Sequence, residues 1–428
     1  MEKSDIFHRA FNIDSWLVEL ASRIERKCGD VFNEISEASE YNLSKVIHAM
    51  QEFNVSDSHF GASTGYGYND RGREVLEQVF ARAFGAEDAL VRHQITCGTH
   101  AIALCLYGIL RPGDEILSVT GKPYDTIEEI TGIRGEKGTG SLRDYGVTYR
   151  QIELTEDGRI DYCLIEKSIR HNTKMVFVQR SRGYELRDPV TIDEIRKVAE
   201  TVKNIKPDTI IMVDNCYGEF VEKMEPTEAG ADIMAGSLIK NPGGGLALCG
   251  GYVAGRKELV NLAAYRMTVP GLGGEVGATL GQNRALFQGF FLAPHTVAES
   301  LKGAVFASAL FEELGYRTCP AYNEKRSDII QAICFENPEA VVAFCQGIQK
   351  GSPVDSFVTP VPSEMPGYDC PVVMAAGAFV QGSSIELSAD APMRPPYTAY
   401  LQGGLVYEHV KLGVLCAVQE LINRKLLK

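Results

Sequence analysis

The chain has 428 residues, of which 45% are hydrophobic and 23% are charged. These values are ordinary for a globular protein and exclude a disordered chain or a coiled coil. Its 43 Lys and Arg residues against 56 Asp and Glu give a net charge of −13, which argues against nucleic acid as a partner. No run approaches the length of a membrane-spanning helix, so no membrane partner is predicted either.

The eleven cysteines include no C-x-x-C pair, so the sequence predicts neither a metal site nor a disulfide framework. The N-terminus lacks the apolar stretch of a signal peptide. We therefore expect reduced thiols and a cytoplasmic protein.

Residues 1–60 form a predicted helical segment. Apolar residues recur there at helical spacing, beginning with Trp16, Leu17, Leu20 and Ile24. A loop is predicted over 61–72, because this stretch is rich in Gly and Tyr and no regular element tolerates that composition well. The next stretch, 74–84, again has the apolar spacing of a helix.

From residue 88 to 255, short apolar runs alternate with helical patterns. The predicted strands are 89–91, 115–119, 148–154, 174–179, 209–214, 233–237 and 245–254. The predicted helices between them are 99–110, 126–133, 162–170 and 192–203. This alternation predicts an α/β fold with a mainly parallel seven-stranded sheet. Ligands of such sheets bind at the carboxyl ends of the strands.

After residue 255 the pattern changes. A long helix is predicted over 278–314, and the remaining residues mix short strands with helices. The strands are 328–334, 372–376 and 384–388, and the helices are 338–350 and 407–427. We therefore predict a large domain over 61–300 and a smaller α+β domain over 301–428.

Gly98 lies where a predicted strand gives way to a helix. A glycine there allows the backbone to approach an anion, and the free N–H groups of the first helical turn favour phosphate. The alternative interpretation is a simple turn.

Asp214 and Lys240 follow two predicted strands, 26 residues apart, which is enough chain to bring neighbouring strand ends together. Asp214 ends a buried apolar run, where a carboxylate needs a partner. It could cap a helix, bind a structural cation or pair with a cationic ring nitrogen. Lys240 follows an apolar run and precedes three glycines, unlike a typical surface lysine.

An aldehyde cofactor explains these three features together. A lysine can form a Schiff base, an aspartate can keep a pyridine nitrogen protonated, and a helix opened by glycine can hold a phosphate. Pyridoxal 5′-phosphate requires all three parts, so it is the predicted cofactor, bound covalently to Lys240.

Four segments carry a family resemblance: residues 65–73 (GYGYNDRGR), 181–184 (SRGY), 213–220 (VDNCYGEF) and 388–397 (SADAPMRPPY). With them the chain resembles the fold-type-I pyridoxal-phosphate enzymes of the Cys/Met-metabolism group. The closer resemblance is to the aluminium-resistance or methionine γ-lyase-like (cystathionine β-lyase-like) proteins. It spans nearly the whole chain and implies that 61–300 is the cofactor-binding domain.

The resemblance also implies site residues. Lys240 would be the Schiff-base lysine and proton shuttle, and Tyr124 would stack on the cofactor ring and take part in catalysis. Asp214 would pair with the pyridinium nitrogen and Tyr217 with the ring 3′-oxygen. The phosphate would be held by Gly98, Thr99 and Ser237 and, from a partner subunit of a homodimer or homotetramer, by Tyr66 or Tyr68 with Arg71.

The sequence departs from this group at two places. Ile239 precedes Lys240 where the lyases carry a threonine, so one phosphate hydroxyl is missing. Glu386 lies where the lyases place the arginine that binds the substrate carboxylate. Arg394 or Arg182 is therefore expected in that role, because a guanidinium can bind a carboxylate through two hydrogen bonds.

The expected function is that of a carbon–sulfur lyase acting on a sulfur-containing amino acid by β- or γ-elimination, with Lys240 kept neutral enough to act as a base. An aminotransferase would use the same cofactor residues, and a racemase or aldolase-type enzyme stays open as well. From another class, the chain could be a non-catalytic stress-related binding protein, although no cluster with metal-ligand spacing supports a metal site.

Overall fold

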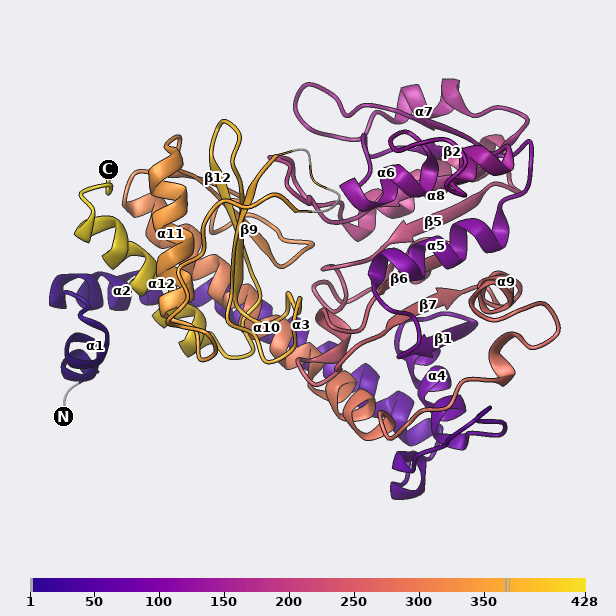
Figure 1. The fold of residues 1–428 in the computed structure, drawn as a ribbon, viewed down its shortest axis with the longest axis horizontal. Helices are drawn as coiled ribbons and strands as arrows, with labels where there is room; N and C mark the ends of the chain where they lie inside the picture. The colour runs from indigo at the N-terminus through magenta and orange to yellow at the C-terminus, as the bar shows by residue number, and fades with distance from the viewer. Residues whose placement is uncertain (1–2, 366–367, 369) are drawn as a thin grey trace. The chain divides into compact units, whose positions relative to one another are not determined.

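The computed structural model describes residues 3–365, 368 and 370–428 (Figure 1). The chain divides into two compact units. We call them the central unit, which comprises Tyr41–Gly183 and Arg187–Ala293, and the terminal unit, which comprises Met1–Glu40, Tyr184–Leu186 and Pro294–Lys428. The domain boundaries proposed from the sequence stay a prediction.

The central unit is built on a seven-stranded sheet with strand order β1-β7-β6-β5-β4-β2-β3. Its strands are β1 (Asp88–Arg92), β2 (Glu115–Ser118), β3 (Thr148–Gln151), β4 (Thr173–Gln179), β5 (Ile210–Asp214), β6 (Ile233–Ser237) and β7 (Gly251–Gly255). Strands β3, β2, β4, β5 and β6 run parallel, whereas β7 is antiparallel to both of its neighbours. The predicted α/β class and mostly parallel seven-stranded sheet are confirmed.

Helices connect these strands. They are α4 (Arg71–Ala83), α5 (Gly98–Ile109), α6 (Asp125–Thr131), α7 (Tyr162–Ser168), α8 (Ile192–Ile205) and α9 (Lys257–Met267). Figure 1 shows α5 along β6 and β7, which it contacts. Apolar residues of β4, β5, β6 and α5 form one buried core. Strand β5 is buried along its whole length, as expected for a central parallel strand covered on both faces.

The terminal unit contains a five-stranded antiparallel sheet with strand order β10-β11-β12-β9-β8. The strands are β8 (Arg317–Cys319), β9 (Ile330–Cys334), β10 (Val372–Ala376), β11 (Ser388–Pro392) and β12 (Thr398–Gln402). Its helices are α1 (Lys3–Phe11), α2 (Ser15–Lys27), α11 (Pro338–Lys350) and α12 (Tyr407–Asn423). Residues of α2, α11, α12 and the sheet share one core.

Two long helices contribute residues to both units. They are α3 (Gly29–Glu52) and α10 (Asn283–Glu313). In α10 the division falls at Pro294. Proline removes a backbone donor inside a helix and interrupts its hydrogen-bond ladder.

Several predicted strand positions are wrong. The run 245–254 was expected to be one strand, but β7 begins only at Gly251, because Gly244 and Gly245 have left-handed φ angles of 54° and 79°. The predicted strand 384–388 overlaps β11 only at Ser388. Strands β8 and β12 were not predicted, since β8 has three residues and β12 begins only two residues after the pair Pro395–Pro396.

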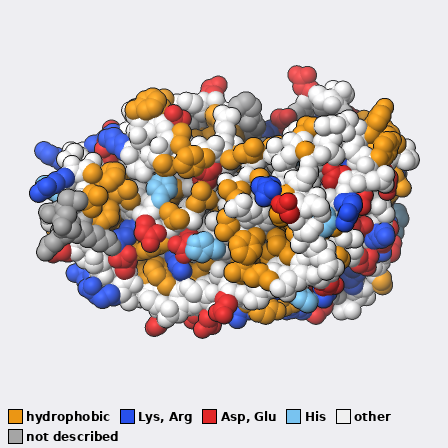
Figure 2. All heavy atoms as spheres, turned by 90° about the horizontal axis from the view of Figure 1, so that it is seen from below, with side chains coloured by type: hydrophobic (Ala, Val, Ile, Leu, Met, Phe, Trp, Pro, Cys, Tyr) orange, Lys and Arg blue, Asp and Glu red, His pale blue; other side chains and the backbone are white. Residues whose placement is uncertain are grey.

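No helix of the described residues is long and apolar enough to span a bilayer. On the face drawn in Figure 2, acidic and basic side chains are interspersed with polar and apolar ones. That face therefore lacks the continuous basic patch that is typical of a nucleic-acid-binding surface.

Candidate active site

The carboxyl ends of three neighbouring parallel strands, β4, β5 and β6, define the candidate site. Asp214 of β5 pairs in register with Gln179 of β4 and with Ala235 of β6. Ser237 ends β6 two residues later. The chain therefore brings Asp214, Ser237 and the residues that follow them to one edge of the sheet, as expected for a ligand site in this class of fold.

Asp214 is buried, with 7% of its surface exposed. Its Oδ1 accepts a hydrogen bond of 3.1 Å from the backbone N–H of Cys216. Burial raises the pKa of the Asp214 carboxyl, although the charge of Lys240 and the bond from Cys216 act in the opposite direction. A buried carboxyl of this kind is stabilised by a cationic partner.

Lys240 lies in the turn between β6 and a short 3₁₀ segment, Asn241–Gly243. Its Nζ is 3.8 Å from the centroid of the Tyr217 ring. Burial lowers the pKa of the Lys240 amine, but Cys216, Tyr217, Asp214 and Glu219 outweigh burial and leave the pKa above its ordinary value. The expectation that Lys240 is kept neutral is wrong for this structure, because potential anions surround the amine.

Gly98 opens α5 beside the ends of β5 and β6. A Cβ added at this glycine would lie 3.0 Å from Sγ of Cys216 and 3.3 Å from Cβ of Ser237. The next residue, Thr99, shares a hydrogen bond of 2.8 Å with Thr126 through the two hydroxyl groups. The first turn of α5 thus meets the buried Ser237 at a helix N-terminus, which is an arrangement that favours an anion.

Tyr124 directly precedes α6. Its backbone N–H donates a hydrogen bond of 2.6 Å to Oε1 of Gln179, at the end of β4. A Cβ added at Gly183 would lie 3.5 Å from Cδ2 of the Tyr124 ring. Tyr124 is therefore held at the carboxyl end of β4, next to the strand that carries Asp214.

Tyr66 and Tyr68 lie in the segment before α4, and Arg71 is the first residue of that helix. The two tyrosines are 71% and 54% exposed, and their ring centroids are 5.5 Å apart. Within the described parts of the chain, no hydrogen bond or ring contact joins these three residues to Gly98, Thr99 or Ser237. The assignment of Tyr66, Tyr68 and Arg71 to a partner's phosphate stays a prediction.

The two arginines considered for the substrate carboxylate lie in different environments. Arg182 is completely buried and follows β4. Arg394 is exposed and belongs to the terminal unit.

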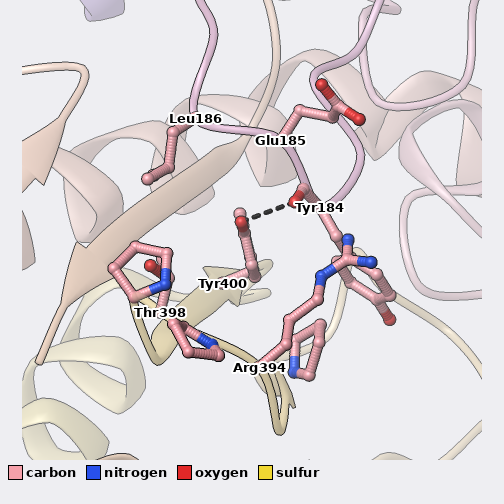
Figure 3. Close-up of a pocket in the computed structure, with 9 residues that line it drawn as sticks. Tyr184, Glu185, Leu186, Arg394, Thr398 and Tyr400 are labelled. Atoms are coloured by element: carbon pink, nitrogen blue, oxygen red, sulfur yellow. Dashed lines mark hydrogen bonds between the residues drawn. The ribbon is translucent and has the colours of Figure 1, made fainter. Parts of the chain in front are cut away.

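Arg394 lines a pocket of about 210 Å³ together with Tyr184, Glu185, Leu186, Pro392, Pro395, Pro396, Thr398 and Tyr400 (Figure 3). Two of these lining residues are linked directly, because the Tyr400 hydroxyl donates a hydrogen bond of 2.7 Å to the backbone oxygen of Tyr184 (Figure 3). The substrate roles of Arg182 and Arg394 stay predictions.

A buried polar network behind Asp214 was not anticipated from the sequence. The hydroxyl of Tyr252 donates a hydrogen bond of 2.8 Å to Oε1 of Glu219. Oδ1 of Asn215 accepts a hydrogen bond of 2.8 Å from Nη1 of Arg180. Nδ2 of Asn215 donates one of 3.0 Å to Oε2 of Glu225. In the sequence, Glu219, a charged residue five positions after Asp214, could have indicated this network. Its partner Tyr252, however, belongs to β7, which is distant in the sequence.

The fold is shared with other α/β proteins, one of which is described as a pyridoxal-5′-phosphate-dependent protein. That protein is Escherichia coli YhfS, which has 18% sequence identity and a TM-score of 0.62 over 91% of this chain and 97% of that one. At this identity the likeness concerns the fold.

Within that class, the methionine gamma-lyase family model matches residues 17–422, so the chain belongs to this family. Bacillus subtilis YnbB is 51% identical over 96% of this chain and 98% of its own. A candidate cystathionine beta-lyase involved in aluminum resistance from Clostridium acetobutylicum has 47% identity and a TM-score of 0.96, covering 99% of this chain and 100% of that one. A carbon-sulfur lyase involved in aluminum resistance from Clostridium novyi has 48% identity and a TM-score of 0.94, covering 98% and 99%.

A more distant relative is the L-methionine gamma-lyase of Treponema denticola. It is 22% identical over 63% of this chain and 60% of its own. The resemblance to methionine γ-lyase-like and aluminium-resistance proteins that the sequence motifs indicated is therefore confirmed.

Proposed function

We propose that this protein is a fold-type-I, pyridoxal-phosphate-dependent carbon–sulfur lyase that acts on a sulfur-containing amino acid. The observation that carries the proposal is the meeting of Asp214, Lys240 and Tyr217 beside the glycine-opened N-terminus of α5. The names of its family and of its close structural neighbours support the same reaction class.

The residues at the strand ends fit this cofactor. Lys240 has the primary amine that an aldehyde requires, and its contact with Tyr217 places that amine beside an aromatic ring. Asp214 supplies a buried carboxyl for a protonated ring nitrogen. Gly98 leaves open a space that even one Cβ would fill, next to Cys216 and Ser237.

When bound, pyridoxal phosphate supplies an aldehyde and a protonated ring that can accept the electron pair left at the α-carbon of an amino acid. Asp214 would hold the proton on the ring nitrogen. Lys240 must first lose its own proton, and its Nζ would then take the α-proton and return it later in the cycle. The balanced reaction consumes one water and releases a thiol, ammonia and a 2-oxo acid.

The first test is the visible absorption of the purified protein before and after borohydride. We expect a visible band that reduction abolishes, with a pyridoxyl group attached to the Lys240 peptide. Lys240→Ala should lose this attachment, and its turnover should fall by at least about 10²–10⁴-fold, the contribution of a positioned base. A colourless protein that does not bind pyridoxal phosphate would contradict the proposal and favour a non-catalytic binding protein.

Assays with cystathionine, methionine and cysteine then separate the reaction types. A lyase releases the sulfur-containing leaving group (hydrogen sulfide from cysteine, methanethiol from methionine, an amino-acid thiol from cystathionine), ammonia and a 2-oxo acid in equal amounts. Conversion of the cofactor to its amine form without release of ammonia would instead identify an aminotransferase. Exchange of the α-proton without loss of sulfur would indicate a racemase.

The proposed enzyme is at least a homodimer, with Tyr66 or Tyr68 and Arg71 of one subunit reaching the phosphate of its partner. The high exposure of both tyrosines supports this arrangement. The loop that carries them is also held in place by hydrogen bonds from Arg73. Arg73 is buried and donates hydrogen bonds of 2.7 Å to the backbone oxygen of Gly67 and 3.0 Å to that of Gly277.

Mixing two inactive variants tests the shared site. Lys240→Ala and Arg71→Ala subunits, unfolded and refolded together, should regain activity, because each mixed dimer contains one site with both native residues. Monomers by light scattering, or mixtures that stay inactive, would contradict the proposal. For localisation we propose the cytoplasm, in keeping with a sequence whose eleven cysteines indicate no disulfide framework and with the rarity of stable disulfides there.

A further inference from the structure

The turn after β5, residues 215–220, carries Tyr217, whose ring centroid lies 3.8 Å from Nζ of Lys240. Two residues of this turn have left-handed φ angles, 72° at Tyr217 and 61° at Phe220. Residues other than glycine keep such angles mainly where the surrounding structure holds them there. The position of the ring over Lys240 therefore depends on the contacts that hold this turn.

Arg180, the residue directly after β4, makes such contacts. Its side chain is completely buried. Nη1 donates one hydrogen bond of 2.8 Å to Oδ1 of Asn215 and another of 2.8 Å to the backbone oxygen of Gly218. These two acceptors belong to residues on either side of Tyr217 in the chain, so a single guanidinium nitrogen closes the turn around the tyrosine.

The turn and its surroundings are shaped for the guanidinium. A Cβ added at Gly218 would lie 2.6 Å from both Cδ and Nη1 of Arg180, so the glycine leaves room for the arginine. The other terminal nitrogen, Nη2, donates a hydrogen bond of 3.2 Å to Oε1 of Glu222. Nη1 also lies 3.6 Å from Oε2 of Glu225. The two acids compensate the charge of Arg180, as a buried guanidinium requires.

We propose that Arg180 is a positioning residue that acts through Tyr217: it holds the turn in the conformation that keeps the tyrosine ring over the amine of Lys240. This inference rests on the proposed role of Lys240 as the residue that carries the cofactor. A ring in this position favours the ammonium form of a lysine. Arg180 thus helps to set how readily the Lys240 amine loses its proton.

Competitive acetylation of the cofactor-free protein with acetic anhydride tests the inference, because only the neutral amine reacts. Mass spectrometry of the Lys240 peptide gives the labelling rate at a pH below the pKa of this lysine. The rate is measured for wild type, Arg180→Met, Tyr217→Leu and the double variant. Because neither cofactor nor substrate is present, the outcome does not depend on whether the protein is a lyase.

The four rates form a double-mutant cycle. In the protein that contains Tyr217, Arg180→Met should release the turn and move the ring, whereas in the Tyr217→Leu background there is no ring to move. We expect the factor by which Arg180→Met raises labelling to be at least about twofold larger in the first case, the least that such a contact contributes. Loss of the arginine charge and general loosening affect both backgrounds alike and cancel.

Arg92→Met is a matched control for the loss of a buried arginine. Arg92 is also buried, donates a hydrogen bond of 2.7 Å to the backbone oxygen of Gly274 and pairs with Glu77. Like Arg180→Met, this variant should lower the midpoint of thermal unfolding. Labelling of Lys240 should nevertheless stay at the wild-type rate, because Arg92 makes its contacts away from the turn.

Arg180→Lys decides the question if Arg180→Met does not fold. Lysine keeps a positive charge for the two acids, but its amine ends one bond short of Nη1 and cannot replace the planar fork of the arginine. It should show the same dependence on Tyr217. An equal change of labelling in both backgrounds would overturn the inference. So would a crystal structure of the variant tested in which Tyr217 keeps its left-handed φ and its ring over Lys240.

Discussion

The Nζ atom of Lys240 lies over the face of the Tyr217 ring, 3.8 Å from its centroid. Tyr217 has a left-handed backbone with a φ of 72°, a conformation that non-glycine residues adopt mainly where the surroundings hold them in it. The turn after β5 thus presents an aromatic face to the lysine that follows β6. The contact favours the ammonium form by about 0.5–2 kcal/mol.

Removal of the ring should therefore make Lys240 easier to deprotonate. We expect Tyr217→Leu to lower the pKa of the Lys240 amine, so that the cofactor-free protein combines with pyridoxal phosphate faster at a given pH below that pKa. Tyr217→Phe keeps the ring but removes the phenol, whose charge also raises the pKa of Lys240, so its effect should be smaller than that of Tyr217→Leu. A Phe variant that behaves like Leu would assign the effect to the hydroxyl.

The close approach at Gly98 should be sensitive to one methyl group. Gly98→Ala places a Cβ 3.0 Å from Sγ of Cys216, which crowds the first turn of α5 while the helix propensity of alanine favours the fold. We expect at least about tenfold weaker binding of pyridoxal phosphate, or about 1.4 kcal/mol. Equilibrium titration of the cofactor-free protein measures this.

The double variant Gly98→Ala/Cys216→Ala is the control for that effect. It removes the sulfur that the new methyl group would meet, so part of the lost affinity should return. Equal losses in the single and the double variant would place the cause elsewhere in the turn.

Asp214→Asn should change stability and cofactor affinity in opposite directions. Asp214 has a pKa raised by burial, so its folded-state pKa lies above the unfolded one. The stability of the cofactor-free protein is then fully present below the unfolded pKa and declines as the pH rises through the folded pKa. Asparagine cannot ionise, and the variant should therefore lose this decline.

Thermal unfolding of the cofactor-free proteins at pH 5 and pH 8 measures that difference. With cofactor, Asp214→Asn should bind at least about tenfold more weakly, because it lacks a charge-assisted hydrogen bond worth about 1.5–3 kcal/mol. Unchanged affinity for the cofactor would contradict the role assigned to Asp214.

Glu115 provides a test of acid stability far from the chemistry. Its Oε2 accepts a hydrogen bond of 2.7 Å from Nε of Arg150, and its Oε1 accepts one of 2.6 Å from Thr173. Burial raises the pKa of Glu115, but the bonds from Arg150 and Thr173 and the charges of Arg150 and Arg170 outweigh burial and leave it below the ordinary value. Glu115→Ala should cost about 1–3 kcal/mol, because it leaves the buried Thr173 hydroxyl without its acceptor.

The sign of its pH dependence is opposite to that of Asp214. A depressed folded-state pKa contributes stability above the unfolded value, and this stability is lost as the pH falls through the folded pKa. The difference between wild type and Glu115→Gln in urea midpoint should therefore be large at pH 7 and shrink in acid. A constant difference would contradict this account.

Much of the central unit could be predicted from the sequence, because most of its strands are buried and appear as apolar runs, although β3 is partly exposed. Asp214 was singled out for the same reason, because it ends such a run, whereas Ser237 came from the family resemblance. Gly98 was singled out because a glycine where a strand gives way to a helix lets the backbone approach an anion, with a simple turn as the alternative.

Other features depend on contacts between distant segments. The pair of Glu219 and Tyr252 requires β7 to lie antiparallel beside β6, and nothing in the local pattern of β7 indicates that order. Strand β11 ends at Pro392, and β12 begins two residues after Pro396. Proline is depleted in strands, so local patterns predict a loop there.

The raised pKa of Lys240 was missed for an electrostatic reason. The sequence shows a lysine after a buried strand, which alone favours the neutral amine. It does not show that Cys216, Tyr217, Asp214 and Glu219 all face that amine. Summed charge at a buried point depends on three-dimensional distances that spacing along the chain does not contain.

Gly98 and Gly236 have a consequence for engineering this protein. A Cβ added at Gly98 would meet the side chain of Cys216, and one added at Gly236 would meet that of Glu219. Single-site libraries at either glycine would contain mainly crowded variants, whereas libraries that vary Gly98 with Cys216, or Gly236 with Glu219, would contain combinations that preserve volume. Substrate range in this scaffold should therefore be searched two positions at a time.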